Sequence, residues 1–455
     1  MRMRSRLTVG VLMLALVLVA AGSACLADDG GGYFGTDYDL GGATVTFAHW
    51  SPASHSTRFK EGEVAQGRLE EAEALFNCKI KFDGVDYSSI GEWYLARLMA
   101  GDSAYDVWMV QNRIAYFPLV TQDALLPIDG IVGEDYWDRL DPFNAYVAET
   151  LSFNGKNYIF SPAADYEEID TIQTGLYVIF YNKTMLQQAG AEDPYELYKA
   201  GEWDWDAMGR IAKQVTKDLD GDGALDQWGM AKIFNWLAHP FLRSNGVDYT
   251  TVDENGRVVF SLGGEAAESA LMQLYEWNMV DKLFDPGWDA LASFTSGTVG
   301  FAIYPLWNYA TIADQSGFEI GILPMPKGSH VDHNVTSIHS IGGFVLPANS
   351  ANPEALLALT EYLYRDDTDT RLDGVDRTLS TYRSRQDAEM ALEMSRNWQG
   401  ETAALLVEEL TLADLYLTIR QVVDDVIFGR LSFSESVNTY RPVIQGILDD
   451  LFNEN

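Results

Sequence analysis

The sequence contains few cysteines and few basic residues. Only Cys25 and Cys78 occur among its 455 residues, too few for the disulfide framework of a small exported domain. Lysine and arginine together number 31, against 67 acidic residues, which gives a formal net charge of −36. This balance argues against binding to nucleic acid or to anionic lipid, because both require a basic surface. We interpret the excess acid as a solvated, charged surface.

Long apolar runs are also scarce. The longest is 9–21, which at roughly 13 residues is shorter than the ~20 that a membrane-spanning helix needs. Arginines precede this run and small residues follow it, so residues 1–24 are predicted to be a secretory signal. Cys25 is then either the acylated cysteine of a bacterial lipoprotein or a residue removed by cleavage after Ala27. We favour the membrane-anchored lipoprotein over a free periplasmic or secreted protein.

Sequence motifs of the common enzyme classes are absent. There is no Walker loop, no Gly-x-Ser-x-Gly nucleophile elbow and no His-Glu-x-x-His metal motif. The absence of these motifs argues only weakly against an enzyme, and we predict that the chain is not one. A secreted glycoside hydrolase or lyase stays open as an alternative, because its two carboxylates would form no local motif.

The chain does contain an alternation of strand and helix patterns. A tether at 25–42, rich in glycine and aspartate, leads into a first block of these patterns. The alternation predicts a parallel sheet, and ligands bind beyond the carboxyl ends of such strands. The loops His49-Trp50 and Gln111-Asn112 follow two of the expected strands. The expected strands of this block are 44–47, 79–82 and 106–110, with helices at 61–76 and 92–99.

A second block of strands and helices begins after Pro162. Its first strand is the apolar run at 176–181, and Asp204 is expected to cap the helix that follows. Asn352 and Pro353 form a strong helix start, since proline fits the first turn of a helix. Further strands are expected at 299–304, 319–323 and 341–346, and further helices at 265–280, 388–394, 403–428 and 434–452.

An acidic loop at 218–226 has the spacing of a calcium site. Alternate acidic side chains can converge on one ion there, and Gly223 allows the sharp turn between them. Gly229 stands where the twelfth position of an EF-hand would supply a glutamate. Two interpretations stay open, a structural Ca²⁺ site and an empty aspartate-rich turn. The expected ligands are the side chains of Asp218, Asp220, Asp222 and Asp226 and the carbonyl of Ala224.

Three short segments follow one another in a characteristic order between residues 154 and 205. They are NGKNYIFSP at 154–162, YVIFYNK at 177–183 and WDW at 203–205, and the acidic loop comes after them. In this order the segments resemble the extracellular solute-binding proteins of family 1, the maltose-binding-protein-like subunits of bacterial ABC importers. The resemblance extends over essentially all of the chain after the tether.

The resemblance implies an α/β fold of the periplasmic-binding-protein-like type II class, with two discontinuous lobes, a hinge and a ligand cleft between the lobes. The N-terminal lobe would comprise 43–163 plus 338–385, and the C-terminal lobe 164–337 plus 386–455. Such a protein captures a carbohydrate and delivers it to a membrane permease, as a monomer that requires no cofactor. Aromatic residues in several loops favour an oligosaccharide. A sugar-sensing lipoprotein without a transport role is an alternative.

Matching the family's motifs places the expected sugar-binding residues. Trp307, Trp236 and Tyr416 match aromatic positions that stack on the ligand. For each of these aromatics the alternative is ordinary core packing. The other residues that the resemblance places at the cleft are His49, Trp50, Gln111, Asn112, Asp165, Tyr166 and Gly343.

Overall fold

The fold is that of a computed structural model. The predicted signal at 1–24, Cys25 and the tether up to residue 31 lie outside the residues that the structure describes. Within the described part of the chain, no helix is both long and apolar enough to cross a bilayer. The described residues are 32–50, 59, 67–112, 114–162, 175–232, 235–287, 289–335, 337–338, 341–364, 382–396 and 413–453.

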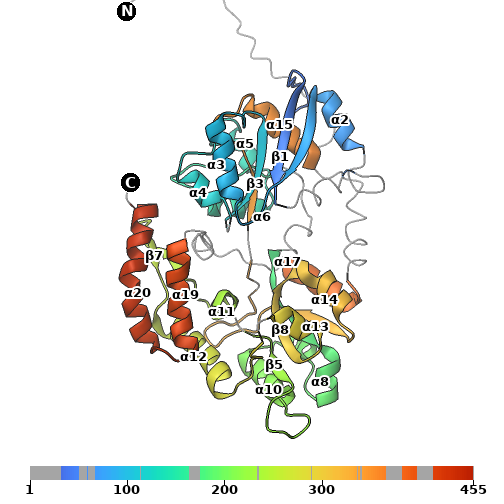
Figure 1. Cartoon of the computed structure of the whole chain (residues 1–455), viewed down its shortest axis with the longest axis vertical. Helices are drawn as coiled ribbons and strands as arrows, with labels where there is room; N and C mark the ends of the chain where they lie inside the picture. Colours follow the sequence, from blue (N-terminus) through green and yellow to red (C-terminus); the bar gives the residue numbers. More distant parts are fainter. Residues whose placement is uncertain are drawn as a thin grey trace, which may run out of the picture.

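Two four-stranded sheets form the centres of two lobes, one above the other in Figure 1. The first sheet has the order β10-β3-β1-β2, with β1 parallel to both of its neighbours. The parallel prediction is wrong for the edge strand β10, which joins from a distant part of the chain and lies antiparallel to β3. The strands are β1 (Ala43–His49), β2 (Cys78–Gly84), β3 (Asp106–Gln111) and β10 (Gly342–Val345).

Helices cover both faces of the first sheet. Successive strand residues point to opposite faces, so Val45 and Phe47 of β1 belong to one apolar cluster and Ala48 to the other. Phe47 packs on the side of α15, and Tyr94 of α3 closes the other side. Both faces of the sheet are therefore buried from solvent, as in most sheets with parallel strands. The helices of this lobe are α2 (Arg68–Leu75), α3 (Ile90–Ala100), α4 (Tyr116–Val120), α5 (Glu134–Trp137), α6 (Pro142–Thr150) and α15 (Pro353–Tyr364).

The second sheet has the order β5-β8-β4-β9. Its strand β4 is antiparallel to both of its neighbours, β8 and β9. The chain arrives from the first lobe at the start of β4, so this strand runs away from that lobe while β8 and β9 return toward it. The parallel prediction is therefore correct in this sheet only for β5 and β8. The strands are β4 (Tyr177–Asn182), β5 (Trp228–Met230), β8 (Val299–Pro305) and β9 (Ile320–Leu323).

One helix of the second lobe begins at a cap that the sequence predicted. The Asp204 carboxylate accepts the N–H of Ala207 at 2.8 Å, which confirms its predicted role at the start of α10. A π-helical turn, η1 (Glu276–Val280), follows α12 directly. The remaining elements are β6 (Thr250–Val252), β7 (Val258–Phe260), α8 (Lys183–Ala189), α9 (Pro194–Lys199), α10 (Trp205–Val215), α11 (Asn235–Arg243), α12 (Gly264–Tyr275), α13 (Ala290–Thr295), η2 (Leu306–Asn308), α14 (Tyr309–Gln315), α17 (Arg385–Arg396), α19 (Ala413–Ile427), α20 (Phe433–Leu448) and η4 (Asp449–Asn453).

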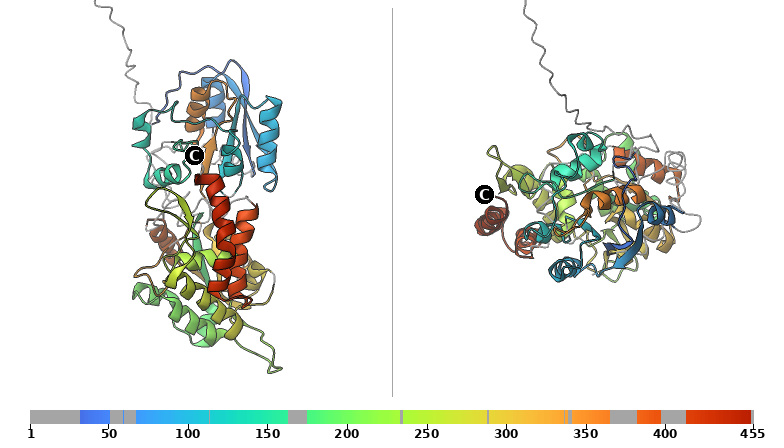
Figure 2. Two further views of the ribbon diagram at one scale, coloured as in Figure 1. Left: turned by 90° about the vertical axis from the view of Figure 1, so that its left-hand side faces the viewer. Right: turned by 90° about the horizontal axis from the view of Figure 1, so that it is seen from above.

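Two chain segments run between the lobes, and their described ends pair with each other at both lobes. Phe160 and Phe344 exchange backbone hydrogen bonds of 2.8 and 3.1 Å at the first lobe. At the second lobe Leu176 bridges Ile338, and the N–H of Tyr177 donates to Ser337 at 2.8 Å. The side view in Figure 2 shows the two lobes stacked along the long axis, with α19 and α20 along one flank of the lower lobe. The described ends of both crossing segments therefore lie next to each other at each sheet.

The pairing of β10 with β3 leaves no room for a side chain at Gly342. A Cβ atom there would lie 2.0 Å from the Val110 carbonyl oxygen, which belongs to the backbone and cannot turn aside. We expect Gly342→Ala to lower the free energy of unfolding by about 3 kcal/mol, as in severe overpacking. Chemical denaturation followed by circular dichroism measures this change.

Gly446→Ala in α20 is the matched control, because a Cβ there meets nothing within 4 Å. It should leave stability unchanged or raise it by about 0.5–1 kcal/mol, since alanine is the better helix former. Equal stabilities of the two variants would contradict the close packing at Gly342.

Candidate functional site

Several of the predicted binding residues meet at one edge of the first sheet. β1 ends at His49 and the parallel strand β3 ends at Gln111, so both residues lie at the same edge. β10 begins there with Gly342 opposite Gln111. The His49 ring is buried against the half-buried Trp50, with ring centroids 3.9 Å apart. Trp50 in turn contacts Tyr87 edge to face. The first sheet thus presents an aromatic and polar edge.

Asn112 and Gly343 hold the crossing segment against this edge. The Asn112 N–H donates to the Ile341 carbonyl at 2.8 Å, and its side-chain oxygen accepts the Ile341 N–H at 3.1 Å. A Cβ on Gly343 would lie 2.6 Å from Ile159, in the neighbouring crossing segment. These two predicted site residues therefore pack at the passage between the lobes, and Gly343 lies within strand β10.

Trp307 lies at the facing edge of the second sheet. β8 ends at Pro305, and η2 follows with its Leu306 N–H donating to the Leu176 carbonyl at 2.8 Å. This bond ties η2 to the point where the chain arrives from the first lobe. Trp307 is 47% exposed, and every other tryptophan whose side chain the structure describes is buried or half-buried. An exposed indole beside the passage between lobes is poorly explained by core packing.

A buried carboxylate supports the segment that carries Trp307, and the sequence analysis missed it. Asp387 of α17 is only 1% exposed, and its Oδ2 accepts the Tyr309 hydroxyl at 2.9 Å. The same hydroxyl accepts the N–H of Arg383 at 3.0 Å, and Lys183 lies 3.8 Å from Asp387 Oδ1. Burial raises the pKa of Tyr309 above its ordinary value, so this phenol stays neutral and donates. The contacts join segments far apart in sequence, and no local motif signals them.

The other predicted site residues are placed only in part. Asp165 and Tyr166 lie outside the described residues. Trp236 lies in the first turn of α11 and Tyr416 in α19, but their side chains are also outside the described set. An ion pair anchors the end of α11, with Nη1 of the buried Arg243 lying 2.9 Å from Oδ1 of the half-buried Asp248.

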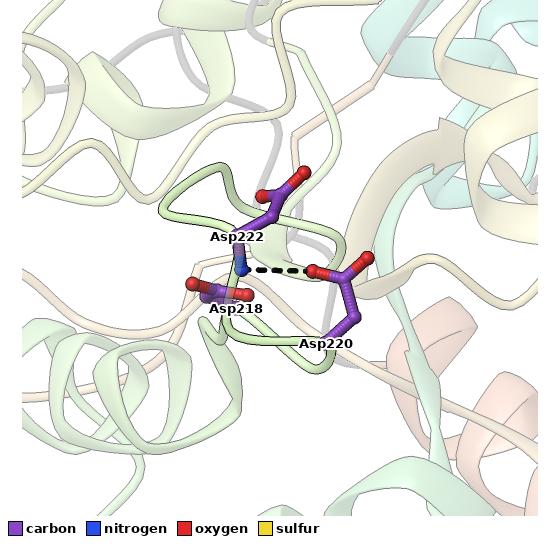
Figure 3. A group of neighbouring side chains, drawn as sticks. All are labelled: Asp218, Asp220 and Asp222. Atoms are coloured by element: carbon purple, nitrogen blue, oxygen red, sulfur yellow. Dashed lines mark hydrogen bonds between the residues drawn. The ribbon is translucent and has the colours of Figure 1, made fainter.

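The acidic loop brings three of the predicted metal ligands together. Asp218, Asp220 and Asp222 are exposed, and one carboxylate oxygen of each lies within 4.8 Å of the others (Figure 3). Asp226 is not in this group, and its Oδ2 instead accepts the Leu219 N–H at 2.7 Å. Backbone N–H groups of Gly223 and Gly221 lower the pKa of Asp218. The predicted fourth side chain therefore closes the loop and leaves three carboxylates at its centre.

Comparisons with known proteins agree with this architecture. The family model for bacterial extracellular solute-binding proteins matches residues 58–369. The structure is similar to the cyclic α-maltosyl-1,6-maltose binding protein of Arthrobacter globiformis, with 14% identity, a TM-score of 0.65 and coverage of 90% of this chain and 100% of that one. A comparison with curated proteins gives no significant match.

Two other solved structures have the same overall arrangement. The maltose/maltodextrin-binding domain MalE of Bdellovibrio bacteriovorus, bound to maltotriose, is 15% identical with a TM-score of 0.61, over 90% of this chain and 100% of that one. UgpB of Mycobacterium tuberculosis, in complex with glycerophosphocholine, is 16% identical with a TM-score of 0.62, and the match covers 90% of this chain and 99% of that one. Likeness at these identities shows the fold, which is that of the type II periplasmic binding proteins.

The buried bond between Tyr309 and Asp387 yields a stability prediction. We expect Tyr309→Phe to lower the free energy of unfolding by about 1.5–3 kcal/mol, the usual range for a hydrogen bond to a charged group. The emission of Trp307 should also change, because the start of α14 loses its tie to α17. Chemical denaturation and tryptophan fluorescence measure the two effects.

Tyr38→Phe is the matched control. Tyr38 donates to the Glu354 carboxylate over the same 2.9 Å, but that pair is exposed to water. Its loss should cost about 0.5 kcal/mol or less, as at other exposed sites. A cost as small for Tyr309→Phe would show that Asp387 does not support the Trp307 segment.

Proposed function

Because the chain belongs to the bacterial extracellular solute-binding proteins, we propose that it captures a carbohydrate between its two lobes and presents it to the permease of an ABC importer. The family match spans well over half of the chain. Membership makes the protein a binding component that acts outside the cytoplasm and agrees with the expectation that it is not an enzyme. The proposal adds the chemical class of the ligand and the place where it binds.

The exposed Trp307 carries this proposal. Pyranose rings present a flat C–H face that stacks on aromatic side chains, and their hydroxyls need a few polar partners. Trp307 offers such a face at the edge of the second sheet, where the crossing segments arrive. His49, Trp50 and Gln111 lie at the edge of the first sheet, where the same segments depart. Closing the lobes would bring these groups onto one ligand.

An oligosaccharide is the ligand that we favour. Three further predicted contacts, Trp236, Tyr416 and Tyr166, would extend the aromatic lining beyond a single sugar ring. The maltotriose complex named above is consistent with this class, and the glycerophosphocholine complex shows that the fold also takes a phosphodiester. A phosphate ligand would need a cation, and the described Arg383 already pairs with Asp314 at 2.9 Å.

We also propose the limits of the lobes and the mode of anchoring. The N-terminal lobe would comprise 43–163 and a return segment from 338, and the C-terminal lobe the rest. Because the Tyr382 ring contacts the ring of Tyr309 in the second lobe, with centroids 4.5 Å apart, we propose that the first lobe ends before Tyr382 rather than at 385. We propose that Cys25 is lipidated, which would hold the protein at the cell membrane. We also propose that the protein is a monomer.

Removal of the Trp307 indole should weaken sugar binding. We expect Trp307→Ala to raise the Kd for the best-bound oligosaccharide about tenfold or more, because a central aromatic contact is worth about 2 kcal/mol. Isothermal titration calorimetry against maltooligosaccharides, monosaccharides and glycerophosphocholine identifies the ligand and measures the change.

Trp93→Ala serves as the control, since Trp93 lies half-buried on the outer helix α3 beneath Arg97. It should bind the ligand as the unaltered protein does. Equal affinity of both variants would move the site away from Trp307. Cleavage of the glycan during the titration, seen by chromatography, would instead favour the hydrolase alternative.

We propose that the acidic loop binds a structural Ca²⁺ ion. The convergence of Asp218, Asp220 and Asp222 supports this, because oxygen ligands from alternate residues are what Ca²⁺ prefers. The family requires no cofactor, so the ion would stabilise the loop and have no part in capturing the solute. Only three carboxylates converge, which predicts weak binding of the kind found in extracellular modules.

Calcium should therefore raise thermal stability at millimolar concentration. We expect 10 mM CaCl₂ to add about 1–3 kcal/mol relative to EDTA, the gain for a dissociation constant of about 0.1–1 mM. The double variant Asp220→Ala, Asp222→Ala should lose this gain. Asp253→Ala, in another exposed turn where one carboxylate accepts two backbone N–H groups, should keep it. Identical melting curves of the unaltered protein in Ca²⁺ and EDTA would refute the site.

A further inference from the structure

A separate hollow of about 490 Å³ opens on the second lobe beside the edge strand β5. Trp228 in its wall pairs with Val299, the first residue of β8, whereas Trp307 lies two residues beyond Pro305, the last residue of that strand. β8 spans seven residues, which corresponds to roughly 20 Å. The hollow is therefore distinct from the proposed sugar site. Six of its lining residues carry the argument: Trp228, Lys232, Asn278, Lys282, Phe284 and Phe428.

The backbone around this hollow departs from regular geometry. The π-helical turn η1 supplies Asn278, and such turns are rare and frequently found at functional sites. Lys282 follows with a φ of 54°, in the left-handed region that residues other than glycine seldom adopt. The next residues add to the sheet edge, since the N–H of Met230 donates to Leu283 and that of Asp285 to Met230, both at 2.9 Å. The π-helical turn and the left-handed residue after it therefore place the exposed Lys282 in the lining of the hollow.

Two cations, Lys232 and Lys282, line the hollow together with the Asp285 carboxylate and with Asn278, whose amide donates to the Ile427 carbonyl at 3.1 Å. Lys232 lies at the rim, where its ammonium donates to the Pro286 carbonyl at 3.3 Å. The Asp285 carboxylate also lines the hollow, but it accepts the Gly287 N–H at 2.9 Å and the Ser293 hydroxyl. Two lysines in one hollow are notable in a chain with 31 basic and 67 acidic residues. The arrangement suits a ligand that brings its own acceptor oxygens.

The walls of the hollow are largely aromatic. Trp228 and Phe428 are half-buried and Phe284 is buried, so their faces line the cavity without filling it. The volume falls within the range of about 300–1,000 Å³ that is usual for small-molecule sites. Apolar walls below a cationic rim match a ligand with an apolar body and one anionic group.

We propose that this hollow is a second ligand site, which binds a small organic anion with an aromatic or apolar body. The anionic group would lie between Lys232 and Lys282, and the body against Trp228, Phe284 and Phe428. The proposal does not depend on the identity of the solute that the cleft between the lobes captures.

Anilinonaphthalene sulfonate tests this site, because it combines an aromatic body with one sulfonate. We expect saturable binding of one molecule per chain at low salt, with energy transfer from tryptophan. The neutral analogue N-phenyl-1-naphthylamine should bind about tenfold more weakly, since it lacks the charge-assisted contacts. The double variant Lys232→Gln, Lys282→Gln should bind the sulfonate about tenfold more weakly and should bind the neutral analogue with unchanged affinity.

Two controls make the outcome decisive. Lys199→Gln, at an exposed lysine of α9, should leave binding of both dyes unchanged, and so should Trp307→Ala at the proposed sugar site. Equal binding of the two dyes would overturn the anionic specificity. Sulfonate binding that survives the double lysine variant, or that is lost in Trp307→Ala, would overturn the location.

Discussion

The pairing of the two crossing segments is the constraint on which the rest of the structure depends. Phe160 and Phe344 bond to each other at the first lobe, and Leu176 and Ile338 at the second. The narrow gap at Gly343 and the two bonds from Asn112 to Ile341 fix the pair against β3. Through this pair, the edge with His49 and the edge with Trp307 are both directed toward the space between the lobes.

The same constraint explains how much could be predicted from the sequence. Strands with dense apolar patterns, such as β4, and helices with clear caps, such as α10 at Asp204, are determined locally and were predicted correctly. The direction of β4 and β10 depends on where the chain enters each sheet, which short patterns do not encode. The support of Trp307 by Tyr309 and Asp387 was missed for a similar reason, because 78 positions separate the two partners. The π-helical turn at η1 likewise lies within a run that reads as ordinary helix.

Charge and aromatic content are distributed differently over the molecule. Part of the acidic excess is gathered in the exposed turn around Asp218, where backbone N–H groups lower the pKa of the Asp218 carboxyl. Among the tryptophans whose side chains the structure describes, all but Trp307 are buried or half-buried, so its exposure is informative where their number alone is not. Composition suggested that some aromatics face a ligand, but only the fold distinguishes Trp307 from structural residues such as Trp108 and Trp203.

The antiparallel strand β10 also determines when the first lobe can finish folding. It supplies the outer neighbour of β3 only after the second lobe's entire sheet has been synthesised. Until then β3 presents an open edge, which is an aggregation hazard in a partly made chain. Contacts between such distant segments also slow folding, because the entropy of closing the long loop is lost before the contacts form. The first lobe therefore cannot complete its fold until most of the chain has been synthesised. This delay is compatible with passage of the unfolded chain through a membrane.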